Sequence, residues 1–284
     1  MNNETPHNTG KKTMTIARRA ALAALLATPA LATVAHAQGA EIGTAARPLK
    51  MGVTAGPHAQ VMEKVRDIAA KDGLVIRIIE FTDYIQPNVA LASGDLDANS
   101  FQTQPFLDQQ VKDRGLKLVS VAKTLTFPMG IYSKKIKSVE ALPQGGRIAI
   151  PNDPTQGGRG LMLFAQAGAI RLPANADVRV TVADITENPK RLRIVELEAA
   201  QLPRALDDVD AAAINTNYAI TAGLQPTRDA IAIERSDSPH SNRIVVRQGD
   251  EEKPWVRKLI NAYQNDQVKA FVAEAFSGSV IPAF

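Results

Sequence analysis

The sequence predicts an α/β protein with two lobes, and three observations lead to this prediction. Short β-branched and apolar runs alternate with helical patterns from residue 49 to residue 123. A second alternation of the same kind extends from about residue 129 to residue 222. Two further strand patterns, at 230–234 and 244–247, then lead into amphipathic helices at the C-terminus. Because strands that alternate with helices are typical of parallel α/β units, we expect two such units joined by two crossover segments.

The first 37 residues have the features of a secretory signal peptide. Basic residues precede an apolar, alanine-rich run at 20–35, and Ala35-His36-Ala37 is a small-x-small cleavage site. The run is too short for a convincing membrane span. Translation starts at either Met1 or Met14. We therefore predict a signal peptide at 1–37, a linker of small residues at 38–48 and a mature protein in the periplasm.

The mature chain carries little net charge and no cysteine. Four basic residues and one acidic residue lie in the first 37 positions, so about +1 of the formal charge of +4 remains. No basic patch indicates a nucleic-acid partner. The lack of cysteine excludes cysteine-based zinc sites and thiol catalysis, and it leaves no residue for a diacylglycerol anchor. We expect a monomer without a lipid anchor.

The first lobe begins with the pattern strand, helix, strand. Residues 49–55 are the first strand, and Gly56-Pro57-His58 turns the chain into a helix. The apolar residues of this helix lie on one face: Val61, Met62, Val65 and Ile68. Residues 75–81 are β-branched and apolar, which predicts a buried second strand.

A helix, a polar loop and a second helix precede the third strand of this lobe. Thr82 or Asp83 caps the first helix and Gly94 ends it. The segment 95–104 is polar and is predicted as a loop, after which Pro105 opens the next helix. The third strand is predicted at 116–123, after Gly115.

Two aromatic residues are predicted on loops of the first lobe. Tyr84 follows the second strand, and Phe101 is the single aromatic residue of the loop 95–104. Both positions lie beyond the carboxyl ends of strands, where ligands bind in open α/β sheets. The alternative is that both rings only cover the edge of the sheet, and the spacing favours neither interpretation.

The second lobe repeats the alternation. Its strands are predicted at 129–133, 147–150, 193–197 and 211–215, and its helices at 139–142, 157–168, 200–206 and 218–222. After the strands at 230–234 and 244–247, two C-terminal helices are predicted at 254–263 and 268–276. We assign 49–124 and 236–284 to lobe 1 and 125–235 to lobe 2.

An exported pair of α/β lobes with two crossover segments is the architecture of a periplasmic binding protein of the type II-like class. In that architecture the ligand lies in an interlobe cleft, and the lobes close over it about a hinge. The sequence therefore predicts a binding protein whose site is formed by both lobes.

Catalytic motifs are missing from the mature chain. Its two histidines, His58 and His240, are far apart in sequence, and no nucleophile motif or P-loop occurs. Asp95 and Asp97 are not followed by the acidic residues of a calcium-binding loop, so we interpret them as helix-stop and cap residues. We expect no enzymatic activity, no metal and no cofactor.

Arg159 is the candidate for binding an anionic group in the second lobe. It ends the segment PNDPTQGGR, in which two prolines bracket a turn and Gly157-Gly158 lead into a helix. Glycines allow a close backbone approach to a ligand, and a guanidinium suits a carboxylate bidentately. Arg159 would lie in the first turn, where a cation opposes the helix dipole. The alternative is a surface salt bridge to Glu196 or Glu198.

Asparagines are the other polar candidates. Asn215 directly follows the strand 211–214, where its amide can both donate and accept hydrogen bonds to a zwitterion. Asn217 is interpreted as a helix cap. Asn242 precedes the strand 244–247 and is either a ligand residue or a turn residue.

The chain from Leu49 to the C-terminus resembles the methionine-binding NlpA/MetQ family of ABC-importer substrate-binding proteins. The resemblance rests on several long motifs in the right order: GPH, FTDYIQPNVAL, DANSFQTQPFL, PMGIYS, PNDPTQGGRGL, VELEAAQLPRAL and INTNYAI. It implies two α/β lobes, L-methionine or a close relative as ligand, and delivery to a membrane permease with its ATPase subunit.

The resemblance also implies roles for individual residues. Tyr84 and Phe101 correspond to aromatic walls around the thioether, since sulfur interacts favourably with aromatic rings. Arg159 corresponds to the carboxylate-binding arginine of the family. Asn215 and Asn242 correspond to amides that hold the α-amino and carboxylate groups.

The chain departs from the family pattern at three points. Thr103 stands where a histidine is usual, Gln156 stands where asparagine is common, and the lipoprotein cysteine is absent. Thr103 is shorter than histidine and always neutral, so we do not expect strict specificity for methionine. The pocket is expected to be larger or to take another amino acid or a methionyl dipeptide. A binding protein of the same architecture for another small anion, such as an organosulfonate, is the alternative function.

Overall fold

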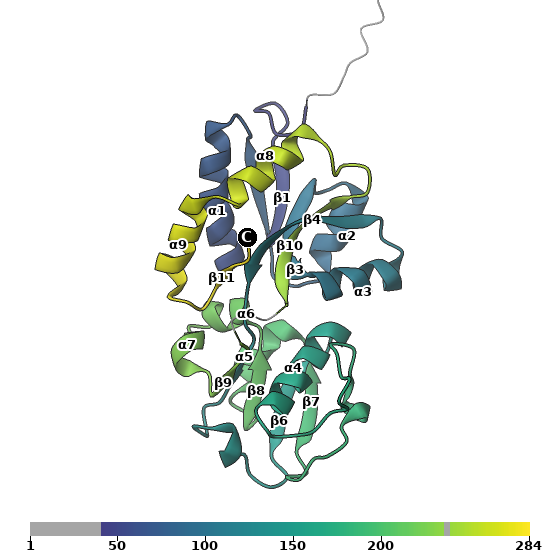
Figure 1. Ribbon diagram of the computed structural model, residues 1–284, viewed down its shortest axis with the longest axis vertical. Coiled ribbons are helices and arrows are strands. Elements are labelled where there is room, and N and C mark those ends of the chain that lie inside the picture. The colour runs from purple at the N-terminus through teal and green to yellow at the C-terminus, as the bar shows by residue number, and fades with distance from the viewer. Residues whose placement is uncertain (1–40, 236–238) are drawn as a thin grey trace, which may run out of the picture. The chain divides into compact units, whose positions relative to one another are not determined.

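The computed structural model describes residues 41–235 and 239–284. The predicted signal peptide, residues 1–37, and the beginning of the predicted linker lie outside these ranges. Two β-sheets, each with helices on both faces, account for most of the described chain (Figure 1). None of the helices in the described ranges combines the length and the apolar character that a membrane span needs.

The first sheet has six strands in the order β11-β4-β10-β3-β1-β2. Their bounds are β1 Leu49–Thr54, β2 Ile76–Phe81, β3 Ala98–Thr103, β4 Leu118–Thr126, β10 Ser241–Arg247 and β11 Ile281–Pro282. β1 pairs in parallel with β2 and β3, whereas β10 is antiparallel to β3 and β4. The expectation of a wholly parallel first lobe is therefore wrong, because β10 re-enters this sheet from the second lobe.

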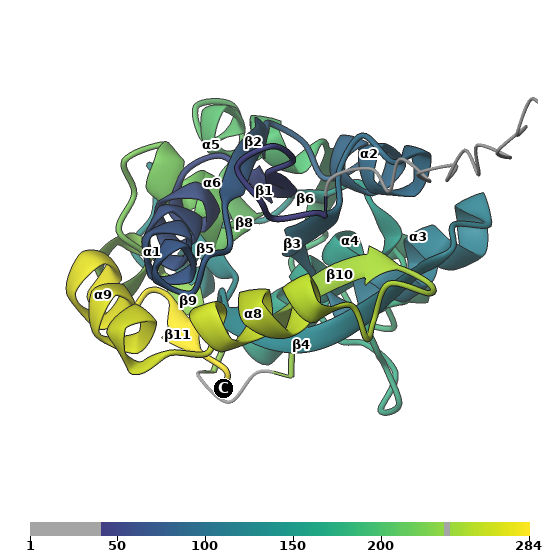
Figure 2. The same ribbon diagram turned by 90° about the horizontal axis from the view of Figure 1, so that it is seen from above.

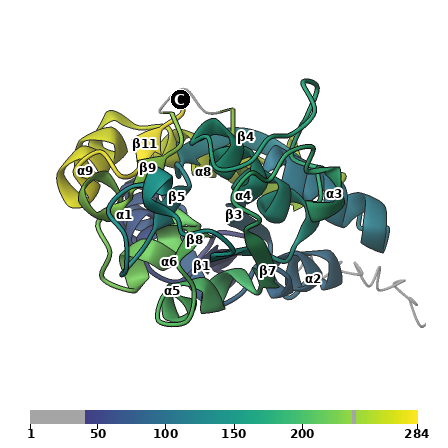
Figure 3. The same ribbon diagram turned by 90° about the horizontal axis from the view of Figure 1, so that it is seen from below.

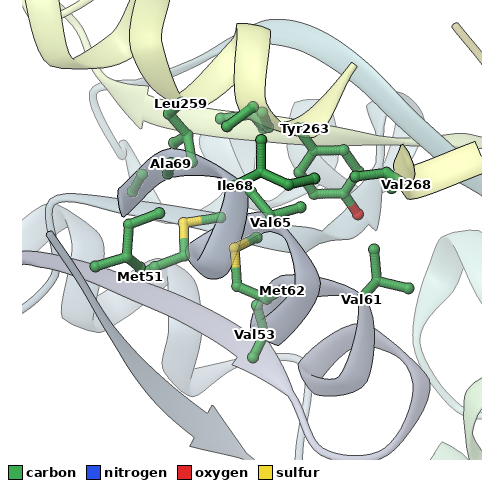
Figure 4. Close-up of a cluster of buried hydrophobic side chains, with 14 of the residues drawn as sticks. Met51, Val53, Val61, Met62, Val65, Ile68, Ala69, Leu259, Tyr263 and Val268 are labelled. Atoms are coloured by element: carbon green, nitrogen blue, oxygen red, sulfur yellow. The ribbon is translucent and has the colours of Figure 1, made fainter. Parts of the chain in front are cut away.

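Helices cover both faces of the first sheet (Figure 2). The helices α1 (Pro57–Lys71), α8 (Pro254–Tyr263) and α9 (Asp266–Phe276) share one apolar core with the sheet. Figure 4 shows this core, where the predicted face of α1, including Val61, Met62 and Val65, packs against the strands and α8. The helices α2 (Gln86–Ser93) and α3 (Gln104–Arg114) pack with the separate cluster of Leu91, Leu107 and Val245.

The strand β3 is the largest error of the sequence prediction, which had placed a polar loop at 95–104. All six of its residues are buried. Its two amide side chains are paired inside the protein: Asn99 Nδ2 and Gln102 Nε2 donate to Asn88 Oδ1 at 2.9 and 2.6 Å. A buried polar group that is hydrogen-bonded costs little. A polar segment can therefore form a central strand, because its partners are on α2.

The second sheet has five strands in the order β7-β6-β8-β5-β9. Their bounds are β5 Gly130–Tyr132, β6 Arg147–Pro151, β7 Arg193–Leu197, β8 Ala211–Ile214 and β9 Ala232–Ile233. The helix α4 (Pro154–Gln166) packs on one face, and α5 (Leu202–Ala205) and α6 (Thr216–Thr221) pack on the other (Figure 3). The shorter elements are α7 (Pro226–Asp229) and the 3₁₀ turns Val139–Ala141, Val182–Asp184 and Ala199–Gln201.

Two crossover segments connect the sheets. The first is Phe127-Pro128-Met129, between β4 and β5, and the second runs from Glu234 to His240, between β9 and β10. The chain thus leaves the first sheet once and returns once, as expected for the two-lobed α/β class. This path brings residues 81–103 and 241–242 of the first sheet together with residues 153–159 and 214–217 of the second.

Candidate functional site

A cavity with an empty volume of about 340 Å³, which includes space open to solvent, is lined by side chains from both sheets. All six predicted site residues line this cavity: Tyr84, Phe101, Thr103, Arg159, Asn215 and Asn242. The same cavity is also lined by residues that the sequence analysis did not assign: His58, Gln102, Phe106, Phe127, Gln156, Thr216 and Asn217.

Aromatic rings form one part of the cavity wall. Tyr84 and Phe101 lie with their ring centroids 6.0 Å apart and 28° between their planes. Phe106 packs edge-on against both of them, and Tyr218 lies 5.1 Å from Tyr84. Phe106 was not predicted, although it follows Pro105 in the first turn of α3. The cluster offers an apolar, polarisable surface of the kind that favours a thioether or another apolar side chain.

Tyr84 also connects the two sheets. Its hydroxyl donates to Asn217 Oδ1 at 2.6 Å, and burial raises the pKa of Tyr84 well above its ordinary value. Asn217 is therefore not the helix cap that we predicted. Asn215 occupies the N-cap position of α6, without a side-chain capping hydrogen bond, and Asn217 lies two residues later, in the first turn.

The helix α4 positions Arg159, and it begins earlier than predicted. Asp153 is its N-cap and accepts a hydrogen bond from the Gln156 amide at 2.9 Å, with Pro154 at the first position. Gly157-Gly158 thus lie within the helix, and Arg159 lies in its second turn. A Cβ atom on Gly158 would come within 2.1 Å of the Val178 carbonyl oxygen. The backbone at Gly158 therefore lies close to the segment around Val178, and a glycine is needed there for packing within the protein.

Arg159 forms a buried ion pair with Glu234. Its Nε donates to Glu234 Oε1 at 2.6 Å and its Nη2 to Oε2 at 2.5 Å, and the two side chains are 5% and 10% exposed. The predicted alternative partners, Glu196 and Glu198, are not involved. Burial opposes ionisation of Glu234, but Arg159 and the backbone amide of Met129 together favour it, and the pKa of Glu234 is lowered. Only tertiary structure brings these residues together, since 75 positions separate them.

Two buried amide atoms at the cavity have no hydrogen-bond partner among the described residues. Asn215 Nδ2 donates to Gln156 Oε1 at 2.8 Å, which leaves Asn215 Oδ1 unpaired. Asn217 Oδ1 accepts from Tyr84, which leaves Asn217 Nδ2 unpaired. Unsatisfied buried polar atoms are costly and rare in folded proteins. One free acceptor and one free donor therefore lie two residues apart at the same cavity.

His58 orients Asn242 on the first-sheet side. Asn242 Nδ2 donates to His58 Nε2 at 2.8 Å and to the Phe101 carbonyl at 3.1 Å. His58 is neutral, since burial lowers its pKa to about 3, so its Nδ1–H donates to Thr54 Oγ1 at 2.8 Å. Asn242 is part of β10, which corrects the alternative of a turn residue. The motif GPH was the one sequence signal that pointed to His58.

The ionisable groups of the site do not suit a metal ion. Within residues 41–235 and 239–284, no three histidine or carboxylate side chains are placed to share one. The cavity offers a paired cation, neutral amides, a neutral imidazole and aromatic rings. This set can hold an organic ligand that carries both donors and acceptors next to an apolar group.

Two solved structures of known proteins share this fold. A nutrient-binding protein from Burkholderia cenocepacia, solved bound to methionine, is 54% identical, with a TM-score of 0.81 over 83% of this chain and all of that chain. A periplasmic substrate-binding protein of an ABC transporter from Coxiella burnetii is 46% identical, with a TM-score of 0.80 over 83% of this chain and all of the other. These matches confirm the predicted two-lobed α/β class.

A curated relative from Escherichia coli K12 is named D-methionine-binding lipoprotein MetQ. It is 47% identical over 236 residues, which are 82% of this chain and 87% of the relative. Because such relatives are named lipoproteins, the comparisons do not support the predicted absence of a lipid anchor.

The model of the family described as NlpA lipoprotein matches residues 49–284, which include every residue of the cavity. The resemblance of the sequence motifs is thereby confirmed, and the chain belongs to the NlpA lipoprotein family.

Proposed function

We propose that this protein is the periplasmic solute-binding component of an ABC importer and that it binds methionine or a closely related amino acid. The observation that carries the proposal is the composition of one cavity. A buried guanidinium, a free amide acceptor and a free amide donor lie beside an aromatic wall. The carboxylate of an amino acid can accept from the guanidinium and the amide donor, and its ammonium group can donate to the amide acceptor. A thioether side chain is complementary to the aromatic wall.

In the proposed binding mode, the charged end of the amino acid contacts the polar residues of the cavity and its side chain contacts the aromatic residues. The carboxylate lies at Arg159, and the ammonium group donates to Asn215 Oδ1. Asn242 provides a further amide for this charged end. The side chain lies between Tyr84 and Phe101, close to Thr103. No step forms or breaks a covalent bond.

The two crossovers divide the chain into the bodies that would close on the ligand. We propose that residues 49–124 with 236–284 and residues 125–235 move as two lobes about these segments and present the ligand to the permease and its ATPase subunit. We also propose export by the signal peptide 1–37 to a position free in the periplasm, because a chain without cysteine has no thiol for a diacylglycerol anchor. Periplasmic extraction without detergent should release the protein, and retention in the membrane pellet would contradict this location.

Identification of the natural ligand tests the binding proposal directly. Freshly purified protein would be denatured, and the released small molecules would be identified by mass spectrometry. Calorimetric titration of the ligand-free protein with both enantiomers of methionine, with other amino acids, with methionyl dipeptides and with sulfonates would follow. We expect methionine or a close relative to be released and to bind most tightly. Binding of a sulfonate but of no amino acid would overturn the proposal.

A further inference from the structure

We propose that Glu234 determines the charge specificity of the site: it cancels the charge of Arg159, so that the cavity selects a ligand with no net charge. This inference rests on the proposed function and deepens it. Glu234 does not itself line the cavity, whereas Arg159 does. Glu234 is therefore a positioning residue that acts through Arg159.

The contacts of the guanidinium show how it is held. Nε and Nη2 donate to the two carboxylate oxygens of Glu234, and Nη2 also donates to the Phe127 carbonyl at 2.7 Å. Nη1 has a longer contact of 3.4 Å, to Gln156 Oε1, a residue that lines the cavity. Nη1 thus remains for a ligand, while the opposite edge of the guanidinium is committed to Glu234.

Both crossover segments contribute to this arrangement. The Met129 amide donates to Glu234 Oε2 at 2.9 Å, and Phe127 supplies the carbonyl for Arg159. Glu234 itself begins the second crossover. The carboxylate is therefore held from both connections between the sheets. Its position is well defined before any ligand arrives.

Among the residues that line the cavity, Arg159 is the one that is charged at neutral pH. The carboxylate of Asp153, the N-cap of α4, lies outside this lining and is ionised at neutral pH, since its pKa is about 6. His58 is neutral with its pKa near 3, and burial keeps the Tyr84 hydroxyl protonated. Behind the ion pair, burial lowers the pKa of His240 to about 4, so it is neutral as well. The charges of Arg235, which is exposed, and Asp177, which is half-exposed, are screened by solvent. Arg159 is then the charged side chain that a ligand contacts, and Glu234 is the carboxylate paired directly with it.

A neutral site favours a zwitterion over an anion. Enclosing a ligand with one net charge would leave that charge uncompensated in a low-dielectric cavity, which is costly. An amino acid with an uncharged side chain leaves no such charge. The ion pair therefore argues against the organosulfonate alternative, although an unpaired arginine would have favoured it.

The test compares three ligands that share one side chain and differ in charge. Methionine is a zwitterion, 2-hydroxy-4-(methylthio)butanoate is a net anion, and methioninamide is a net cation. Calorimetry would give Kd values for the wild type and for Glu234→Gln, which exposes the arginine charge. We expect the preference for methionine over the hydroxy acid to fall by about tenfold or more in Glu234→Gln, and the preference over methioninamide to rise.

Two further variants separate charge selection from damage to the fold. Glu234→Asp keeps the charge, so it should keep the ligand preferences of the wild type even if all three ligands bind more weakly. Glu187→Gln removes a carboxylate from the exposed pair with Arg171 and makes the same change in net charge. It should leave all three Kd values unchanged. If Glu234 had a purely structural role, Glu234→Gln would weaken the binding of all three ligands by the same factor.

Each outcome bears on one of the two proposals. If the wild type binds none of the amino acids tested, the proposed function fails. If it binds methionine but Glu234→Gln keeps the ligand preferences, the inference about Glu234 is wrong and the proposed function stands. Should Glu234→Gln not fold, the wild type decides: binding of the hydroxy acid within about threefold of methionine would overturn the inference, and stronger discrimination against both charged analogues would support it.

Discussion

The two walls of the cavity differ in how completely their polar groups are paired. On the first-sheet wall, His58 uses both ring nitrogens, and Asn242 Nδ2 has two acceptors. On the second-sheet wall, Asn215 and Asn217 each keep one buried amide atom without a partner among the described residues. The ring of His58 and the amide nitrogen of Asn242 are thus paired without a ligand, whereas Asn215 Oδ1 and Asn217 Nδ2 need a ligand to supply their partners.

This difference indicates that the two sheets have different tasks. The first sheet holds its side chains in place before a ligand binds, and the second sheet keeps hydrogen-bonding groups free for the ligand. The paired wall fixes the shape of the apolar part and the orientation of one amide. The unpaired wall holds hydrogen-bonding capacity that is costly until a ligand uses it. Substitution of the unpaired amides on the second wall should therefore affect binding more than stability, and substitution of His58 or Asn242 on the first wall should affect both. The following predictions test this comparison, from the largest expected effect to the smallest.

Truncation of Arg159 should have the largest effect. Arg159→Ala removes the proposed carboxylate partner and leaves Glu234 buried without its counterion, so we expect methionine binding to weaken by about 2–5 kcal/mol. Calorimetric titration measures the loss. The folded state should be destabilised as well, which urea denaturation would show. Equal affinity of the variant and the wild type would refute the role of this arginine.

Removal of the ligand should lower the stability of the folded protein. A ligand present at 100 times its Kd stabilises the folded state by about 2.7 kcal/mol, which for a chain of this size corresponds to a rise in Tm of about 5–10 °C. Differential scanning calorimetry of dialysed protein, with and without methionine, measures this shift. A sulfonate of similar size serves as the control and should not produce it.

Asn215 and Asn242 allow a direct comparison between the walls. Asn215→Ala should weaken methionine binding by about 2 kcal/mol, as for a lost hydrogen bond to a charged group, and should change the stability of the ligand-free protein little. Asn242→Ala leaves His58 Nε2 without its donor and should reduce both. Titration and urea denaturation of both variants check this. A greater loss of ligand-free stability in Asn215→Ala would contradict the division between the walls.

The pH dependence of stability has opposite contributions from His58 and Asp153. The pKa of His58 is 6.5 in the unfolded state and about 3 in the folded state. The unfolded state therefore binds a proton first as the pH falls below 6.5, and the folded protein loses stability through this residue. Burial raises the pKa of Asp153 from 3.8 to about 6, so acid stabilises the fold through Asp153 between these values. His240, with its pKa lowered to about 4, adds to the effect of His58.

Asp153→Asn should therefore make the protein more sensitive to acid. The amide can still cap α4, but the stabilising protonation is lost. Between pH 6 and pH 4 we expect the free energy of unfolding of the variant to fall more steeply than that of the wild type, by up to about 1.4 kcal/mol per pH unit. Urea denaturation at three pH values measures how the free energy of unfolding changes with pH in both proteins. The same change in the variant and the wild type would contradict the stabilising effect of Asp153 protonation.

A change in the aromatic wall should have the smallest effect. Phe101→Leu keeps an apolar surface but removes the ring that we place beside the thioether. We expect methionine binding to weaken by about 0.3–1.5 kcal/mol, the range for sulfur–aromatic contacts. The matched measurement uses norleucine, which has a methylene in place of sulfur and should lose less. An equal loss for both ligands would place the sulfur away from this ring.

Much of the architecture follows from local patterns. The apolar face of α1 and the bounds of α8 agree with the structure because helical periodicity and a proline at the helix start are encoded within one segment. The six predicted site residues line one cavity because Tyr84, Arg159 and Asn215 all lie near the carboxyl ends of strands. The long motifs shared with the family supported the same choice.

The hydrogen bonds and ion pairs between residues far apart in the chain depend on tertiary structure alone. β3 has a polar sequence, and it becomes a buried strand because Asn88 satisfies its amides. No local signal marks Glu234, and the motif GPH marks His58 without indicating its partner, since each residue acts through another at least 75 positions away. Periodicity encodes which face of an element is apolar. The partner of a buried charge or amide is instead set by how separate elements pack, because its hydrogen bonds are made across space and leave no regular spacing in the sequence.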